Sequence, residues 1–402
     1  MRPQEPPSRK PRLLVLASTY PRWRDDPEPA FVHELSKRLI HRFEVTVLCP
    51  HAPGAAMREI FDGVRVVRYR YAPTRWETLV NDGGIVSNLN RARWKLLLVP
   101  GFILAQVVTA WRMVRAGEVD VMHAHWLLPQ GMVAALVARA QAGRKVPFLV
   151  TSHGADLFAL RGRFARWVKA WVVGRAAIVT VVSEGMRQPM LKLGVVPASL
   201  GVEPMGVDLT GQFTPDAEAE RSRDELLFVG RLVEKKGLRH LIDAMPTILA
   251  ERPSAFLTVA GFGPEMEDRR DQVSRLALSD RVKFLGAVKQ EDLVALYRRA
   301  AVFVAPFIEA GSGDQDGLGL VIVEAAGCGA PVVVSDMPAT HALNGLSSQA
   351  LVVRWSNAEE LARAILSVRW SGHREQAWMA FDWNQRAAAY KRILEDVLRE
   401  PR

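Results

Sequence analysis

The residues best suited to chemistry lie in the glycine-dense segment 309–336, which reads EAGSGDQDGLGLVIVEAAGCGAPVVVSD. A loop ending at Asp316 leads into a helix that we expect to begin at about Leu318. The backbone N–H groups of such a loop, with the positive end of the helix, can bind phosphate or sugar oxygens. Glu324 follows on this helix, where its carboxylate can accept two hydrogen bonds from the vicinal diol of a ribose. Alternatively, Asp316 only caps the helix and Glu324 pairs with a surface base.

A second segment, 226–237, reads LLFVGRLVEKKG and places two cations directly after a predicted strand. The strand ends at Gly230, and Arg231 and Lys236 follow in the turn towards a helix. A planar guanidinium and a compact ammonium together suit a diphosphate. Solvated surface charges are the alternative interpretation.

Further polar residues follow strands in the first half of the chain. His153 and Asp156, in TSHGAD, come just after a predicted strand, where His153 can either bond a substrate hydroxyl or serve the structure alone. His123 and His125, in HAHW, have no third zinc ligand nearby in the sequence. The DQD at 314–316 follows a glycine loop instead of an apolar strand, so we expect no metal site.

These residues need a scaffold, and the chain alternates short apolar runs with amphipathic stretches from end to end. Such alternation predicts two doubly wound α/β domains, with ligands bound at the carboxyl ends of the strands. The seam is expected in 203–216, which is rich in proline and glycine. The expected strands are 13–17, 45–49, 64–69, 119–123, 148–151, 178–182, 226–229, 256–260, 282–285, 302–305, 331–334 and 350–353. The expected helices are 31–41, 131–142, 163–173, 238–250, 293–300 and 358–370.

Composition fits a folded chain of 402 residues, with 49% hydrophobic and 24% charged residues, which excludes wholesale disorder. Two cysteines favour a reducing compartment, and residues 1–12 form a proline-rich basic leader without the apolar run of a signal peptide. Residues 1–210 hold 29 Lys+Arg against 16 Asp+Glu, whereas residues 211–402 hold 24 against 27. The basic first half therefore predicts an anionic partner. No nucleic-acid-binding signature occurs, so a lipid surface or a phosphate-bearing substrate is favoured over nucleic acid.

Two apolar segments bear on the membrane. The stretch 96–110 spans about 15 residues and is broken by Pro100 and Gly101, so we expect it not to cross a bilayer, which needs about 20 consecutive apolar residues. The segment 161–171, RGRFARWVKAW, interleaves basic and aromatic residues and can lie on an anionic membrane surface. Core-facing aromatics with a basic outer face are the alternative.

Taken together, these segments resemble glycosyltransferase family 4, the retaining GT-B transferases. The second half carries the resemblance through VGRLVEKKG (229–237), AGFGP (260–264) and DGLGLVIVEAAGCGAPVV (316–333). The first half resembles the family more loosely, and 381–394 resembles its closing helix. The resemblance implies a flexible leader (1–12), an acceptor-side Rossmann-like domain (13–205, completed by a helix at about 385–402) and a donor-binding Rossmann-like domain (206–384).

The resemblance also implies roles for individual residues. Arg231 and Lys236 would hold the donor diphosphate, Glu324 its ribose and Asp316 its sugar. His153 would touch that sugar from the facing domain. The remaining donor contacts would come from the backbone of Gly230, Gly317, Leu318, Gly319 and Leu320. No metal or other cofactor is expected.

Three positions depart from the family pattern. Asp316 stands where glutamate is usual, which can change the sugar selected or weaken its binding. The loop after the first strand, TYPRWRDDPEPAF, has no glycine, and Met205 replaces a common asparagine before GVD.

The expected function is metal-independent transfer of a sugar, with retention, from a nucleotide-diphosphate donor (UDP-sugar favoured, then GDP-sugar). The acceptor would be lipid-linked, a polysaccharide or a glycolipid, and the protein cytoplasmic, with peripheral contact at the inner face of the membrane. A non-catalytic nucleotide-sugar-binding protein is the alternative. A retaining glycosidase using Asp316 and Glu324 ranks last, because the Arg/Lys diphosphate site has no purpose in that chemistry.

Overall fold

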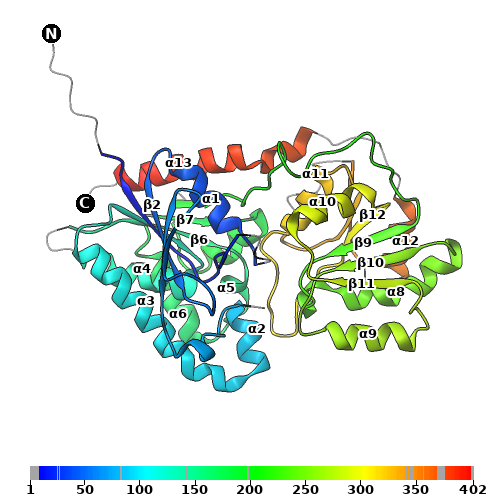
Figure 1. Cartoon of the computed structure of the whole chain (residues 1–402), viewed down its shortest axis with the longest axis horizontal. Helices are drawn as coiled ribbons and strands as arrows, with labels where there is room; N and C mark the ends of the chain where they lie inside the picture. Colours follow the sequence, from blue (N-terminus) through cyan, green and yellow to red (C-terminus); the bar gives the residue numbers. More distant parts are fainter. Residues whose placement is uncertain are drawn as a thin grey trace, which may run out of the picture.

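The computed structural model describes residues 9–24, 26, 28–81, 84–140, 144–196, 199–340, 343, 348–355, 357–368 and 376–399. Most of the expected leader, the ends of the expected helices 131–142 and 358–370, and residues 400–402 therefore lie outside the described residues. Two α/β domains stand side by side, each built on its own sheet (Figure 1).

The first domain contains an eight-stranded sheet in the order β3-β4-β2-β1-β5-β6-β7-β8. Its strands are parallel except for β3, which pairs antiparallel with β4. Strand order reverses between β1 and β5, so ligands are expected at the carboxyl ends of these two strands. The strands are β1 (Arg12–Leu16), β2 (Glu44–Pro50), β3 (Arg58–Phe61), β4 (Val64–Tyr69), β5 (Val121–His125), β6 (Phe148–Ser152), β7 (Ile178–Val181) and β8 (Leu200–Val202).

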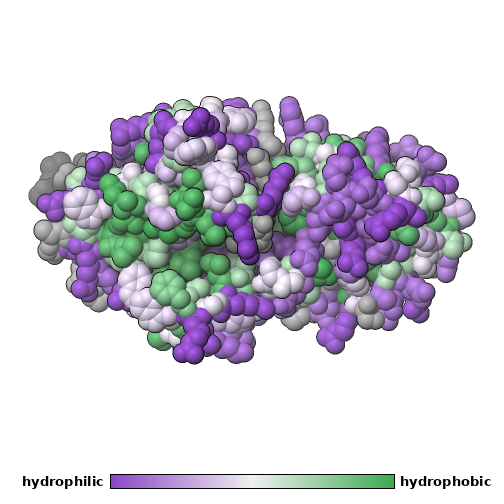
Figure 2. Space-filling view, turned by 90° about the horizontal axis from the view of Figure 1, so that it is seen from below, coloured by the Kyte–Doolittle hydropathy of each residue, from purple (hydrophilic) through white to green (hydrophobic). Residues whose placement is uncertain are grey.

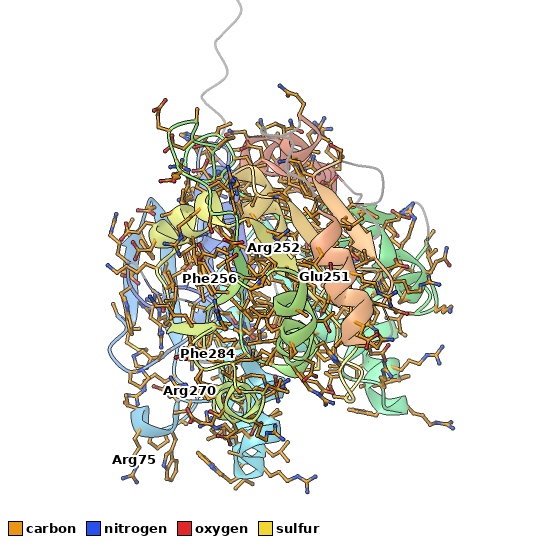
Figure 3. The ribbon with its side chains drawn as sticks, turned by 90° about the vertical axis from the view of Figure 1, so that its right-hand side faces the viewer. Arg75, Glu251, Arg252, Phe256, Arg270 and Phe284 are labelled. Atoms are coloured by element: carbon orange, nitrogen blue, oxygen red, sulfur yellow. The ribbon has the colours of Figure 1, made fainter. Side chains whose placement is uncertain are left out.

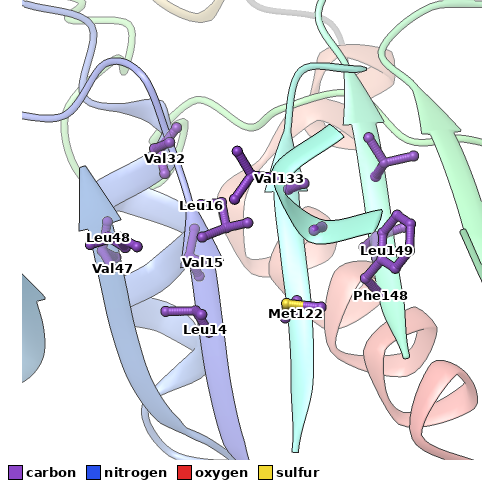
Figure 4. Packing of buried hydrophobic residues seen from close by; sticks show 14 of the residues in the cluster. Leu14, Val15, Leu16, Val32, Val47, Leu48, Met122, Val133, Phe148 and Leu149 are labelled. Carbon is purple, nitrogen blue, oxygen red and sulfur yellow. The ribbon is translucent and has the colours of Figure 1, made fainter. Parts of the chain in front are cut away.

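Helices cover both faces of this sheet, which explains why its central strands are nearly continuous apolar runs. On one face lie α1 (Phe31–Leu39) and α13 (Trp383–Arg399), which contact each other. On the other lie α3 (Leu98–Arg115), α4 (Met132–Val137) and α6 (Arg163–Val173). Figure 4 shows the resulting core, with side chains of β1, β2, β5 and β6 between the helices.

The second domain contains a six-stranded parallel sheet in the order β11-β10-β9-β12-β13-β14, and its order reverses between β9 and β12. Its strands are β9 (Glu225–Val229), β10 (Phe256–Ala260), β11 (Val282–Gly286), β12 (Val302–Ala305), β13 (Val332–Ser335) and β14 (Ala350–Val353). Its helices are α8 (Leu238–Glu251), α9 (Met266–Arg275), α10 (Gln290–Arg299), α11 (Leu320–Gly327) and α12 (Ala358–Ser367). Seen end-on, this domain presents charged residues such as Glu251 and Arg270 to solvent (Figure 3).

The last helix returns to the first domain. Trp383 donates its backbone N–H to Val207 at 3.1 Å, where the chain crosses between the domains a second time. Tyr390, Leu394 and Val397 of α13 are fully buried in the core of the first domain. In Figure 1 this helix runs along the upper edge of that domain, which is therefore completed by the end of the chain.

Most expected strands and helices agree with the structure, but two expectations were wrong. Strand β5 begins two residues later than expected, so His123 and His125 both lie within it. The stretch 96–110 is not broken at Pro100, because α3 runs unbroken from Leu98. Pro100 sits in the first turn of that helix. Backbone N–H groups of the first turn have no hydrogen-bond partner within the helix, so a proline there removes no helical hydrogen bond.

Among the described residues, one helical stretch is long and apolar enough to cross a membrane. It is Arg93–Arg115, with 23 residues and a mean hydropathy of 1.6 over its most apolar 18 residues, of which 33% are buried. Phe102, Gln106 and Ala110 on this stretch pack into the first domain. Leu97, Leu104 and Trp111 of the same stretch are exposed.

Candidate active site

The loop after β9 lies at the switch point of the second sheet and positions two lysines. Gly230 directly follows the strand and donates its N–H to the Ala260 carbonyl at 3.0 Å. The short helix η6 (Glu234–Lys236) then ends at Gly237, whose φ is +67°. A β-carbon at Gly237 would lie 1.8 Å from the Pro306 carbonyl oxygen, so this close approach requires glycine.

The carboxylate of Asp316 forms ion pairs with both lysines of this loop. Lys236 contacts its carboxylate directly, and Lys235 lies 3.3 Å from it and 3.1 Å from Asp314. Burial acts to raise the pKa of Asp316, but Lys236 and Lys235 outweigh it and hold that pKa below its usual value. Lys236 also stands 4.2 Å above the Phe307 ring. Asp316 is thus an ionised carboxylate paired with cations, and it does not cap the following helix as the alternative interpretation supposed.

The helix after this loop begins at Leu320, two residues later than expected, and carries Glu324 one turn in. Glu324 is 9% exposed, and its Oε2 accepts a 2.9 Å hydrogen bond from the hydroxyl of Tyr297 on α10. Burial raises the pKa of Glu324 to about 7, against the opposing effects of Tyr297 and Lys236. The alternative in which Glu324 pairs with a surface base is therefore wrong.

The loop between Asp316 and this helix packs across the cleft onto the first domain. A β-carbon at Gly317 would lie 2.3 Å from the His153 carbonyl oxygen, and one at Gly154 would lie 2.5 Å from the Gly317 nitrogen. Leu318 and Leu320 are partly buried against the cores of both domains, with Gly319 between them. The two domains therefore meet at a glycine-to-glycine contact.

His153, at the carboxyl end of β6, reaches the cleft from the first domain. Its Nε2 lies 3.0 Å from Nδ1 of His125, and its ring packs at 4.9 Å from Phe31 and 5.0 Å from Trp126. Burial, with a smaller effect from the nearby imidazole of His123, lowers the pKa of His153 to about 3. His153 is therefore neutral at pH 7 and can bind only as a neutral hydrogen-bonding group.

Other polar residues singled out in the sequence support this histidine. Asp156 accepts the backbone N–H of His153 at 3.1 Å and that of Leu127 at 2.7 Å, so it shapes the turn. His123 is fully buried and bonds Thr151 at 2.8 Å. His123 and His125 thus belong to a buried polar cluster beneath the cleft.

A cavity of about 1370 Å³ connects these residues across the two domains. It is lined by Gly230, Arg231, Lys236, Asp316, Gly317, Leu318, Leu320 and Glu324 of the second domain and by His153 of the first. The cavity therefore brings together the two segments singled out in the second half of the sequence, 226–237 and 309–336, and His153 of the first half.

The comparisons with known proteins agree with this architecture. The model named Glycosyl transferases group 1 matches residues 213–378, and the Glycosyl transferase 4-like domain model matches residues 29–206. The chain belongs to the group 1 glycosyltransferases of the family 4 type. Among its relatives is a GDP-mannose-dependent alpha-(1-6)-phosphatidylinositol monomannoside mannosyltransferase of Mycobacterium tuberculosis, 28% identical over 291 residues, or 68% of this chain and 75% of that protein. A glycogen synthase of the same organism is 26% identical over 413 residues, or 95% of this chain and 94% of that protein.

Solved structures of low sequence identity share the GT-B fold with this glycosyltransferase. Sucrose-phosphate synthase from Thermosynechococcus elongatus has a TM-score of 0.76 at 22% identity, covering 97% of this chain and 99% of that one. HepE of Anabaena in complex with UDP-glucose has a TM-score of 0.69 at 18% identity, covering 96% and 99%. The expected fold of two Rossmann-like domains facing each other is confirmed.

Sequence reasoning missed two side chains of this glycosyltransferase site. Lys235 was passed over in favour of Lys236, because sequence alone does not show which of two consecutive lysines lies near Asp316, and both do. Tyr297 lies on α10, which is separated in the sequence from the glycine-rich loop. His125 was singled out only as a possible zinc ligand. Its contact with His153 could have been anticipated, since the two residues stand at the carboxyl ends of strands that are adjacent in the sheet.

Proposed function

We propose that this glycosyltransferase transfers a sugar, with retention, from a nucleotide-diphosphate donor. The observation that carries the proposal is the convergence of Lys236, Asp316 and Glu324 at the switch point of the second sheet, opposite His153. Cations suit a diphosphate, and a buried carboxylate suits a ribose diol. The relatives named for GDP-mannose and the neighbour solved with UDP-glucose support a donor of this class.

In the proposed reaction, Arg231 and Lys236 bind the diphosphate and stabilise the negative charge that it gains as the glycosidic bond breaks. Asp316 orients the donor sugar, and the backbone of residues 317–320 binds its oxygens. His153 donates to or accepts from a sugar hydroxyl. The acceptor hydroxyl attacks from the face that the diphosphate leaves, and its proton passes to the departing diphosphate oxygen, so the protein itself needs no general base.

Calorimetric titration tests the donor site. UDP, GDP and ADP are titrated into wild type and Lys236→Ala, in EDTA and then with Mg²⁺. We expect one nucleotide to bind without metal, and the variant to bind it about 10- to 150-fold more weakly, because a charged hydrogen bond is worth about 1.5–3 kcal/mol. Absence of binding by all three nucleotides to the wild type would overturn the donor site, and binding only with Mg²⁺ would overturn metal independence.

We further propose that the enzyme works at an anionic membrane surface, where a lipid-linked acceptor is available. The support comes from an apolar stripe on the outer face of η2 (Arg93–Leu97) and α3, where Leu97, Leu104 and Trp111 recur at seven-residue spacing and are 82%, 63% and 41% exposed. Arg112 and Arg115 stand beside this apolar stripe. A surface helix of a soluble domain normally carries polar residues there.

Helix α6 adds a second exposed apolar site on the same domain. Phe164 and Trp167 stack on each other at 6.0 Å, are 75% and 61% exposed, and are flanked by the exposed Arg163 and Arg166. Figure 2 shows apolar surface gathered on the first domain, whereas the second is mainly hydrophilic. Aromatic residues beside arginines are typical of helices that lie on anionic lipid.

Sedimentation with vesicles tests the membrane contact. We expect the protein to sediment at low salt with vesicles of phosphatidylcholine and phosphatidylglycerol, but less with phosphatidylcholine alone. Leu104→Glu should weaken the association. Ile60→Glu, which changes an equally exposed apolar residue on β3, is the control. Failure of the wild type to sediment with the anionic vesicles at low salt would overturn the contact.

A further inference from the structure

The cleft cavity extends beyond the donor site into the first domain, between helices that the proposed reaction does not use. On one side lie α2 (Gly84–Arg91), η2 (Arg93–Leu97) and α3, and on the other lies α6. We call this extension the acceptor-side groove. It is lined by Ile85, Leu89, Leu96, Val99, Ile103 and Phe164.

The groove is apolar beyond what the fold uses: four of its lining residues also pack partly against the domain core, whereas Leu96 and Phe164 do not. Helix α3 is anchored in the domain core by Phe102, which is 1% exposed. Leu96, Val99 and Ile103 form a separate stripe at spacings of three and four residues, which faces the cavity. Leu96 and Phe164 are 55% and 75% exposed. Such exposure has an unfavourable free energy in water, and a bound apolar ligand would remove it.

The groove is continuous with the donor site, because residues of both line the same cavity. Polar groups also line this cavity. His153 and Asp316 meet the cavity where the domains touch. From the first domain it is lined by Arg91, by Arg24, which pairs with Asp62 at 3.3 Å, and by the carboxylates of Asp26, Glu28 and Glu34. A ligand that fits this distribution has a hydrocarbon chain and an anionic, hydroxyl-bearing head. A purely glycan ligand would find few hydrogen-bonding partners along the apolar walls.

We propose that the acceptor-side groove binds the hydrocarbon chain of an amphiphilic acceptor and thereby aligns the acceptor's head with the donor sugar at His153 and Asp316. This inference rests on the proposed function, because it assigns the chemical class of the second substrate. Arg91, an exposed residue of the lining, supplies the positive charge that a phosphate linkage between chain and sugar requires. The exposed aromatic pair on α6 borders the groove, so the chain can enter from the proposed membrane surface.

The test uses two short amphiphiles, dodecyl phosphate and farnesyl phosphate, each below its critical micelle concentration, with inorganic phosphate as the chainless probe. Calorimetry compares wild type, Leu96→Asp and Phe164→Asp, two exposed positions where substitution leaves the core intact. Ile60→Asp is the matched control, since Ile60 is 70% exposed on the same domain and lies outside the groove. Circular dichroism checks that each variant is folded.

We expect a chain-bearing probe to bind the wild type about tenfold or more tightly than phosphate, because the groove buries its methylene groups. Leu96→Asp and Phe164→Asp should each lose about tenfold, and Ile60→Asp should be unchanged. Preference for farnesyl phosphate would identify an isoprenoid carrier, and preference for dodecyl phosphate an acyl lipid. Equal binding of all three probes, or wild-type affinity in both groove variants, would overturn the proposal.

Two added titrations separate this inference from the donor proposal. If neither UDP nor GDP binds while the chain-bearing probes bind in the groove, the donor site fails and the groove stands. If a nucleotide binds but the amphiphiles bind no better than phosphate, the groove fails and the donor site stands. Binding of maltoheptaose that Leu96→Asp abolishes would make the groove a glycan site and overturn the hydrocarbon assignment.

Discussion

The hydroxyl of Tyr297 donates a 2.9 Å hydrogen bond to the carboxylate of Glu324, and this bond joins two helices beneath the donor cavity. It fixes the position of a buried acid whose pKa, near 7, lies within the working range of most enzymes. Small changes in pH therefore decide whether this group meets a ligand as a carboxylate or as a neutral acid.

Donor affinity should accordingly rise with pH. Ribose hydroxyls donate to the ionised form of Glu324, so binding of UDP-glucose or GDP-mannose should strengthen about tenfold between pH 6 and pH 8 as this form becomes dominant. These donors suit the measurement because their diphosphates lack the second ionisation near pH 6 of a terminal phosphate. Calorimetry at several pH values measures the effect.

The control for that dependence is Glu324→Gln. The amide should bind the donor about 10- to 150-fold more weakly at pH 8, with little variation between pH 6 and 8. Since burial raises the folded-state pKa, Glu324 favours folding below pH 4.5, and this contribution is lost as pH rises through 7. Glu324→Gln should thus be at least as thermally stable as wild type at pH 8. A variant that keeps wild-type affinity would contradict the ribose role.

Asp316→Asn should separate binding from turnover. Asp316 holds Lys235 and Lys236 in the absence of donor, and it competes with the diphosphate for the same cations. Removing its charge should leave UDP or GDP binding unchanged or tighter. Turnover should fall about 10- to 150-fold, because the sugar loses a charged hydrogen bond. Parallel loss of nucleotide affinity and turnover would instead make Asp316 a structural partner of the lysines.

The contact between Gly317 and His153 should be sensitive to a single methyl group. Gly317→Ala would place a β-carbon 2.3 Å from the His153 carbonyl oxygen, which forces the domains apart at the site. We expect turnover to fall while each domain keeps its fold, because the displaced contact lies between domains. Gly311→Ala, whose β-carbon would lie 3.5 Å from Glu234, is the matched control in the same loop. Equal activities of the two variants would rule out a tight requirement at this contact.

The buried histidine cluster should make the protein sensitive to acid. Burial lowers the folded-state pKa of His123 and His153 to about 3, so unfolding takes up protons below pH 6.5. Each of these two groups should cost about 2 kcal/mol of stability between pH 7 and pH 5. Glu324 has the opposite effect on stability over this pH range. The quantity to compare between wild type and His123→Gln is therefore the loss of unfolding free energy between pH 7 and pH 5.

Urea unfolding at pH 7 and pH 5 measures that difference. His123→Gln retains a hydrogen-bonding group for Thr151 but cannot take up the proton. It should lose about 2 kcal/mol less than wild type on acidification. Identical acid sensitivity of the two proteins would show that His123 is protonated in the folded state.

The fold could be predicted from sequence because burial on both faces of a parallel sheet leaves a strong one-dimensional signal. Strands such as Val64–Tyr69 and Phe256–Ala260 agree with expectation to the residue. The boundary of α11 could not be placed, since glycines 317 and 319 can extend a loop as readily as begin a helix. Pro100 led us to expect a break in the stretch 96–110. Proline breaks a helix in its interior but not in its first turn, and the sequence does not show where this helix begins.

The site could be predicted in part. Lys236 was singled out as a cation that follows a strand, and Asp316 and Glu324 as acids that follow a glycine-dense loop; all three line one cavity. Tyr297 was not, because its contact with Glu324 depends on how α10 packs against α11, which no local pattern encodes. The apolar groove was likewise not predicted, since its walls come from four elements, α2, η2, α3 and α6.

The return of α13 to the first domain has a consequence for synthesis on the ribosome. The second domain can fold once the chain has emerged as far as Phe381, because α12, Trp378 and Phe381 complete its core after β14. The first domain cannot bury Tyr390, Leu394 and Val397 until α13, which follows the second domain in the chain, has left the ribosome. We therefore expect the second domain to finish folding before the first, which remains incomplete until α13 packs against it.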